Sequence, residues 1–346
     1  MTIDATAKRS ERVQPKTLFA WGLITATTLP FIAFATHLTV AIPALFMIIM
    51  IGGTHVPATG YLLADPEVRR FCSAHPIKMI VAPLILMATA FLIFSRPGPL
   101  FTQAAILFFL FQTWHFGAQN IGVSSFISLS DRARPLAPFE KTAIKAGIWV
   151  GMLGVLQTMS PDFTIGAAYM PLPAGEVVLL RVFYEIGEVL AILMTGAALW
   201  FGITAWRKGQ GAFGAAIFLS ITFLFPMYLT HDFTIGFTSF VTAHGLQYLI
   251  FLAAHSAGRD QIRPLRSRIA APVLLLFFIL VAGPAFIRGG ALRTTDFPSL
   301  GIAIAFSITL AHFWLDRYLW RMKDKDRAAW VRARFQGVLR PFHSIA

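Results

Sequence analysis

Residues 77–94 read IKMIVAPLILMATAFLIF, an apolar run whose only charged residue is Lys78. A helix needs about 20 apolar residues to cross the hydrocarbon layer of a bilayer, so this run predicts a transmembrane helix. Similar runs recur along the chain, at residues 17–36, 38–56, 100–118, 143–159, 176–206, 212–229, 233–255, 269–286 and 298–320. An alternative end for the run at 100–118 lies after IGVSSFISL, residues 121–129. Together they predict an all-α, polytopic transmembrane helical bundle of about ten helices.

The composition also favours a membrane protein. Of the 346 residues, 56% are hydrophobic and only 13% are charged, whereas about a quarter of the residues of a soluble domain are charged. The length would allow two soluble domains, but no hydrophilic stretch is long enough to form one. We therefore expect one transmembrane domain at residues 17–322, between a cytoplasmic tail at 1–16 and a basic amphipathic cytoplasmic tail at 323–346.

The distribution of positive charge predicts the orientation. The net charge is +13, but the Lys and Arg residues lie in short segments between apolar runs, which argues against nucleic-acid binding. If the N-terminus is inside, the ten crossings leave only Arg96, Arg288 and Arg293 in the outer loops. Cytoplasmic loops carry the excess of Lys and Arg in membrane proteins, so both termini are predicted to be cytoplasmic.

The ends of the chain and its cysteine content add three expectations. The N-terminal residues MTIDATAKRSERVQPK lack an apolar core and a cleavage site, so we expect no removable signal peptide. The tail alternates charged residues with apolar ones such as Trp330 and Phe335, which predicts an amphipathic helix bound to the lipids of the anionic inner leaflet. Cys72 is the only cysteine, which excludes an internal disulfide.

Histidines on four separate predicted helices share a depth in the membrane. Counted at 1.5 Å per residue from the outer end of each helix, they lie within a layer about 8 Å thick. Imidazoles that converge from facing helices build metal sites in bundle cores, and histidine commonly binds iron, copper and zinc. The alternative for each histidine is an ordinary hydrogen bond between helices. The predicted metal ligands are His55, His115, His244 and His312.

Polar residues follow three of these histidines at helical spacing. They are Gln119 and Asn120 after His115, Gln247 and Tyr248 after His244, and Asp316 after His312. Such groups can accept the proton of the ring nitrogen that does not bind the metal, which fixes the tautomer of the imidazole. Asp316 is also a candidate catalytic carboxylate.

The segment RVFYEIGEVL, residues 181–190, places charges inside another predicted helix. Arg181 and Glu185 are four residues apart and can pair, and Glu188 lies one turn further on the same face. Glu188 reaches about the depth of His244. This depth makes Glu188 a candidate catalytic residue or metal ligand, and the alternative is a structural Arg–Glu pair that joins two helices.

Short motifs around the histidines resemble the Brp/Blh β-carotene 15,15′-dioxygenase family. The resemblance rests on HFG at His115, on the segment around His244 and on HFWLD at His312. It implies a polytopic protein of the bacterial inner membrane that holds iron through histidines and cleaves a carotenoid. This chain departs from the family pattern because Gln119 and Asn120, rather than an acidic residue, follow HFG.

Four functions are compatible with these features. The first is a membrane-embedded, histidine-ligated metal-dependent oxidoreductase or oxygenase, with Fe(II) as the metal and a lipophilic, carotenoid-like molecule as substrate. The second is a transporter or proton-coupled carrier that uses intramembrane His and Glu side chains. The third is a haem protein with two axial histidines, and the fourth is a structural protein without a site.

Overall fold

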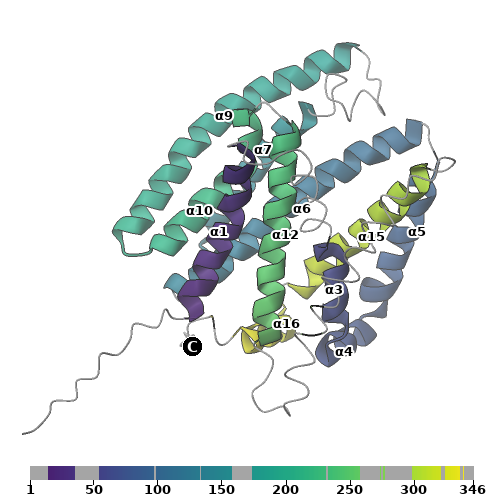
Figure 1. The fold of residues 1–346 in the computed structure, drawn as a ribbon, viewed down its shortest axis with the longest axis horizontal. Coiled ribbons are helices and arrows are strands. Elements are labelled where there is room, and N and C mark those ends of the chain that lie inside the picture. Colours follow the sequence, from purple (N-terminus) through teal and green to yellow (C-terminus); the bar gives the residue numbers. More distant parts are fainter. Residues whose placement is uncertain are drawn as a thin grey trace, which may run out of the picture.

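The computed structural model describes most of the chain. The described residues are 15–35, 54–96, 99–132, 134–157, 174–230, 233–257, 273, 276, 298–320, 324–335 and 338. Every regular element within these ranges is a helix, which confirms the all-α prediction (Figure 1). The helices are α1 (Pro15–Ala35), α3 (His55–Leu63), α4 (Pro66–Ala74), α5 (Ala82–Phe94), α6 (Pro99–Arg132), α7 (Pro138–Gln157), α9 (Ala174–Arg207), α10 (Gly211–Thr222), α11 (Pro226–Thr230), α12 (Phe233–Ala257), α15 (Pro298–Leu319) and α16 (Lys325–Arg334), with a π-helical turn η2 (Ile77–Val81) before α5.

Two helical segments among the described residues have the length and composition needed to cross a membrane. They are Ile77–Phe94, formed by η2 and α5, and Val178–Arg207 within α9. The helix α6 is longer than the window 100–118 that predicted it. Residues 38–53 of the second predicted window, and the window 269–286 except for 273 and 276, lie outside the described residues.

The helix α6 lies at the centre of the packing. It contacts α1, α5, α7, α10, α12 and α15, while α9 packs on α7 and α10 at one edge of the molecule (Figure 1). At the other side, α15 packs along α5 and also contacts the short helix α3. This arrangement brings α3, α6, α12 and α15, the four helices that carry the predicted metal ligands, to one region.

Close approach of backbones positions α7 against α10. A Cβ atom added to Gly147 of α7 would overlap the carbonyl oxygen of Ile221 in α10. A Cβ added to Gly151, one turn further, would overlap the side chain of Leu224. The two glycines therefore allow α7 and α10 to pack at a distance that larger residues would prevent.

An ion pair fixes the turn between α6 and α7. The guanidinium of Arg132 donates to both carboxylate oxygens of Glu140, over 2.7 and 2.9 Å, and the N–H of Ala137 also donates to Glu140. Burial alone would raise the pKa of Glu140, but these hydrogen bonds and the charge of Arg132 hold it below its usual value. The same guanidinium lies 3.4 Å from the ring centre of Phe213 in α10.

The C-terminal helix α16 packs on the bundle through its apolar side chains. Its Trp330 and Val331, with Phe335 just beyond it, are buried in the core that includes α1 and α12. Arg334 donates to the carboxylate of Asp65 over 2.9 Å, and both side chains are buried. The apolar face of this amphipathic helix is therefore buried against the bundle. Burial against protein removes apolar side chains from water as effectively as burial in lipid does. Contact of this helix with the lipids of the inner leaflet stays a prediction.

Candidate metal centre

The imidazoles of the four predicted ligands meet inside the bundle. His55 begins α3, which packs between α12 and α15, and its Nε2 lies 3.1 Å from Nε2 of His244 on α12. The ring of His55 is also 4.9 Å from that of His312 on α15, measured between centroids. Three helices thus bring three histidines into one cluster.

His115 of α6 completes this cluster. Its ring centroid lies 5.0 Å from that of His244 and 5.5 Å from that of His312. The imidazole also stacks on the ring of Phe313, at 4.0 Å between centroids. Contact with an aromatic ring on one side orients His115 towards the other three histidines.

Several ring nitrogens of the cluster are buried without a hydrogen-bond partner. They are Nε2 of His115, Nδ1 of His244 and Nε2 of His312. A buried polar atom without a partner costs about 1–3 kcal/mol, and such atoms are few in native proteins. A metal ion bound by Nε2 of His115 and Nε2 of His312 would satisfy two of these three atoms.

A hydrogen-bonded chain orients His312. Its Nδ1 lies 2.7 Å from Oγ1 of Thr59, which lies 2.8 Å from the hydroxyl of Tyr248. The Tyr248 hydroxyl donates to Oδ1 of Asp316 over 2.9 Å. Since this chain ends on a carboxylate, each hydroxyl donates once towards Asp316, and Nδ1 of His312 carries the proton at its start. The lone pair of Nε2 then faces the cluster, as a metal ligand requires.

The geometry of the cluster fits a metal ion. Imidazole nitrogens bind divalent metals at about 2.0–2.2 Å, so two ligands of one ion are about 3–4 Å apart. The 3.1 Å between Nε2 of His55 and His244 lies in this range. The ligand atoms of His55, His244 and His312 all lie within 4.8 Å of one another. Small side-chain rotations would therefore bring the three nitrogens to a common ion.

Asp316 lies at the edge of the same site. Its Oδ2 is 3.5 Å from Nε2 of His312, and His115, His312 and Asp316 form a second group whose ligand atoms lie within 4.8 Å of one another. The carboxylate is buried beside Tyr248, one helical turn after His312. Asp316 is thus placed to bind an ion at this position or to hold the Tyr248 hydroxyl.

The predicted amide neighbours act on the helices rather than on the rings. Gln119 donates to the carbonyl oxygen of His244 and to Gln247, and Gln247 donates to Asn120 and to Thr27 of α1. In these bonds the amides do not accept a proton from an imidazole. The network joins α6, α12 and α1, and so fixes the height of His115 relative to His244.

Glu188 lies on α9, which is not one of the four helices that carry the histidine cluster. It is half-buried on α9. The helix α9 packs on α7 and α10, at the edge of the molecule away from α3 and α15 (Figure 1). The depth estimate gave its height along the bundle but not its direction from the bundle axis.

Two residues that touch the cluster were not among the predicted site residues. Thr59 follows His55 by one helical turn, so the i,i+4 rule could have identified it. Phe313 follows His312 directly, and only the packing of α15 against α6 shows its contact with His115. His255, three turns below His244, is buried between Tyr61 and Trp330 and does not join the cluster.

Comparisons with protein-family models, with curated proteins and with solved structures found no match to this chain.

Proposed function

We propose that this chain is a polytopic integral membrane protein that binds a transition metal through its buried histidine cluster and oxidises a lipophilic substrate. The observation that carries this proposal is the convergence of His55, His115, His244 and His312 from four helices. A structural role does not require four imidazoles at one point, because a single hydrogen bond joins two helices at lower cost.

The membrane part of the proposal is supported by the outer surfaces of α5 and α9. Large apolar side chains are exposed along both helices, among them Leu84, Ile85 and Leu92 on α5 and Ile192 and Leu193 on α9. Soluble monomers rarely expose continuous apolar surfaces of this extent. We propose the ten-helix topology with both termini in the cytoplasm, in the inner membrane of a bacterium. Reporter fusions after Lys208 and Arg268 are expected to score cytoplasmic, and an external score at either position would contradict this topology.

Iron is the metal that fits the proposed chemistry best. Neutral imidazoles suit iron, copper, nickel and zinc, and a ferrous ion held by histidines with open positions would supply activation of dioxygen. The residues of the chain would orient a metal ligand and accept a proton. Thr59 and Tyr248 hold the tautomer of His312, and Asp316 provides a buried acceptor for the Tyr248 proton.

A lipophilic substrate agrees with the surroundings of the cluster. The rings of Phe313 and Phe116 lie directly against His115 and His244, at 4.0 and 4.5 Å between centroids. An apolar wall beside the imidazoles favours a hydrocarbon over a charged substrate. The resemblance to the Brp/Blh family supports a carotenoid-like molecule.

A haem is a poorer fit than a single ion. Two axial imidazole nitrogens on opposite faces of a haem iron are about 4 Å apart, with the porphyrin between them. The 3.1 Å between Nε2 of His55 and His244 is too short for that arrangement. The other two rings also crowd the same space, at 4.9 to 5.5 Å between centroids.

A proton-coupled carrier is a second candidate, because one observation favours it. The chain from His312 through Thr59 and Tyr248 to Asp316 is a continuous path for a proton inside the bundle. A carrier of this kind needs no metal, so metal analysis separates the two proposals.

Elemental analysis and an absorption spectrum of the purified protein test the proposal. We expect iron to co-purify without a haem absorption band. A protein that takes up neither iron nor any other divalent transition metal would overturn the metal centre and leave the carrier. A haem absorption band would instead support a haem protein with two axial histidines.

A further inference from the structure

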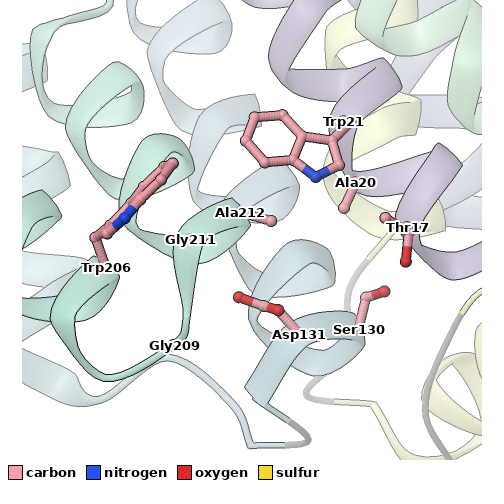
Figure 2. A pocket seen from close by; sticks show the side chains of 9 residues that line it. All are labelled: Thr17, Ala20, Trp21, Ser130, Asp131, Trp206, Gly209, Gly211 and Ala212. Carbon is pink, nitrogen blue, oxygen red and sulfur yellow. The ribbon is translucent and has the colours of Figure 1, made fainter.

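A cavity of about 380 Å³ lies apart from the histidine cluster, where the ends of four helices meet. Its wall is formed by Thr17 and Trp21 of α1, Ser130 and Asp131 at the end of α6, Trp206 at the end of α9, and the start of α10. Figure 2 shows the two indole rings on either side of the Gly211–Ala212 backbone, with the Asp131 carboxylate below them. This volume suits a small ligand or a lipid headgroup.

The backbone of the α9–α10 turn shapes one side of this pocket. Gly209 has a positive φ of 74°, a conformation that favours glycine, and it lets the chain reverse within a few residues. A Cβ added to Gly211 would lie 3.4 Å from the ring of Trp206. The indole therefore packs closely on the first residue of α10 and is held as a wall of the pocket.

Asp131 supplies a negative charge at the base. Its Oδ2 accepts a hydrogen bond from the backbone N–H of Phe213 over 3.1 Å, at the start of α10, where the helix dipole attracts negative charge. The neighbouring cation does not neutralise it, since Arg132 is bound to both carboxylate oxygens of Glu140. The pocket therefore presents a carboxylate to a ligand.

The two tryptophans favour a cation in the same space. The face of an indole attracts ammonium groups, and Trp21 and Trp206 are 41% and 61% exposed beside the pocket. The hydroxyls of Ser130 and Thr17 add oxygen atoms that can accept a hydrogen bond. A primary ammonium can donate to these oxygens and to Asp131, whereas a quaternary ammonium has no N–H to donate.

Arg207 and Lys208 lie in the chain between two lining residues, Trp206 and Gly209, and we call these two cations the rim of the pocket. Arg207 and Lys208 directly follow Trp206 and are exposed, and no carboxylate among the described residues forms an ion pair with either. A ligand with an ammonium group and an adjacent phosphate would match both the base and the rim. Phospholipids with an ethanolamine headgroup have this arrangement.

We propose that this pocket binds the headgroup of a phosphatidylethanolamine, with the ammonium between Trp21, Trp206 and Asp131 and the phosphate at Arg207 and Lys208. The inference rests on the membrane part of the proposed function but not on the metal centre. In the proposed topology these helix ends are at the cytoplasmic interface, where the headgroups of the inner leaflet lie. Tryptophans at that level commonly anchor a membrane protein, and here two of them also form a binding site.

Native mass spectrometry of the full chain in detergent tests this site. The protein is incubated with equal amounts of phosphatidylethanolamine and phosphatidylglycerol that carry the same acyl chains. The spectrum then gives the number of molecules of each lipid that the protein retains. We expect the wild type to retain phosphatidylethanolamine preferentially. Asp131→Asn should lower this preference by about tenfold, because Asn still accepts from the Phe213 N–H but carries no charge.

Tryptophan variants supply an independent measurement and a matched control. Trp206→Leu should lower the preference by about fivefold through loss of the cation–π contact. Trp200→Leu removes an equally exposed tryptophan from the same helix, 70% exposed and outside the pocket, and should leave the preference unchanged. The metal content of each variant should match that of the wild type. A failure of the lipid-site proposal is therefore distinguishable from a failure of the metal-centre proposal.

Three results would overturn the proposal. The first is equal retention of the two lipids by the wild type. The second is an undiminished preference in both Asp131→Asn and Trp206→Leu. The third is displacement of the lipid by soluble glycerophosphoethanolamine at equal concentration, because the ligand would then be a soluble zwitterion rather than a membrane lipid.

Discussion

Replacing Thr59 by valine removes one hydroxyl from the chain that orients His312 and changes the shape of the side chain little. In the wild type, Nδ1–H of His312 donates to Oγ1 of Thr59 over 2.7 Å. Without that acceptor the imidazole can take the other tautomer, in which the proton lies on Nε2 and blocks the lone pair that faces the cluster.

The expected loss follows from the role of such acceptors in metal sites. Removal of a hydrogen-bond partner behind a histidine ligand weakens metal binding by about 10- to 100-fold, which corresponds to about 1.4–2.7 kcal/mol. The protein should also unfold more easily by about 1–3 kcal/mol, because the Nδ1–H of His312 is left buried without an acceptor. Loss of affinity and loss of stability are therefore both expected.

Competition with a chelator measures the metal affinity of the Thr59 variants, and thermal unfolding measures their stability. Thr59→Ser keeps the hydroxyl and should bind the metal within a few-fold of the wild type. Thr195→Val is a matched control, since that hydroxyl donates only to the carbonyl of Ala191 in its own helix. Equal metal affinity in Thr59→Val and the wild type would refute the role of this chain in orienting His312.

Three further predictions concern the packing of the bundle and its inner end. Gly147→Ala should destabilise the protein by about 1–3 kcal/mol through overlap of its Cβ with α10, whereas Gly122→Ala, with open space around its Cβ, should be neutral or stabilising in the same thermal scan. Arg334→Met should lower the free energy of unfolding by about 3–5 kcal/mol, because its buried carboxylate partner is left unpaired. Arg70→Met, at an exposed position, should lower it far less. Equal midpoints of thermal unfolding for the two variants would contradict this. Burial raises the pKa of the Cys72 thiol, so iodoacetamide should modify Cys72 slowly at neutral pH and quickly after denaturation, and rapid modification of the folded protein would contradict its burial.

The helices with the longest apolar runs could be predicted from the sequence. Residues 77–94 form η2 and α5 at the predicted bounds, and the window 176–206 corresponds to α9. Such runs define a helix without reference to the rest of the chain, because every backbone polar group is paired within the helix. The end of α6 at Arg132 lies near the alternative end after residues 121–129, since the polar residues after His115 are accommodated by packing inside the bundle.

The amphipathic tail shows why the partner of an apolar stripe is harder to predict. The pattern around Trp330 and Phe335 indicates which face of α16 is apolar, but a bilayer and a protein core satisfy that face equally well. In the structure, Trp330 and Phe335 are buried in the bundle, and Arg334 pairs with Asp65. Those two residues are far apart in the chain, and no local pattern joins them.

For the candidate site, the sequence predicts the depth of each residue but not the direction in which its side chain points. The rise of a helix gives the depth of His55, His115, His244 and His312, but whether their rings meet depends on the rotation of four helices. Glu188 has a similar depth and lies elsewhere, because α9 packs on the far side of α7 and α10. Depth alone could therefore suggest a set of residues without distinguishing those that converge.

The metal content of a His115→Ala, His244→Ala double variant tests the central claim most directly. The wild-type protein, purified and offered ferrous iron, should hold a metal ion in each chain, and the double variant should hold none while it remains inserted and folded. His75→Ala, at an exposed position outside the cluster, should retain the metal as the wild type does. Full metal retention in the double variant would contradict the shared site and leave the four histidines with a structural role.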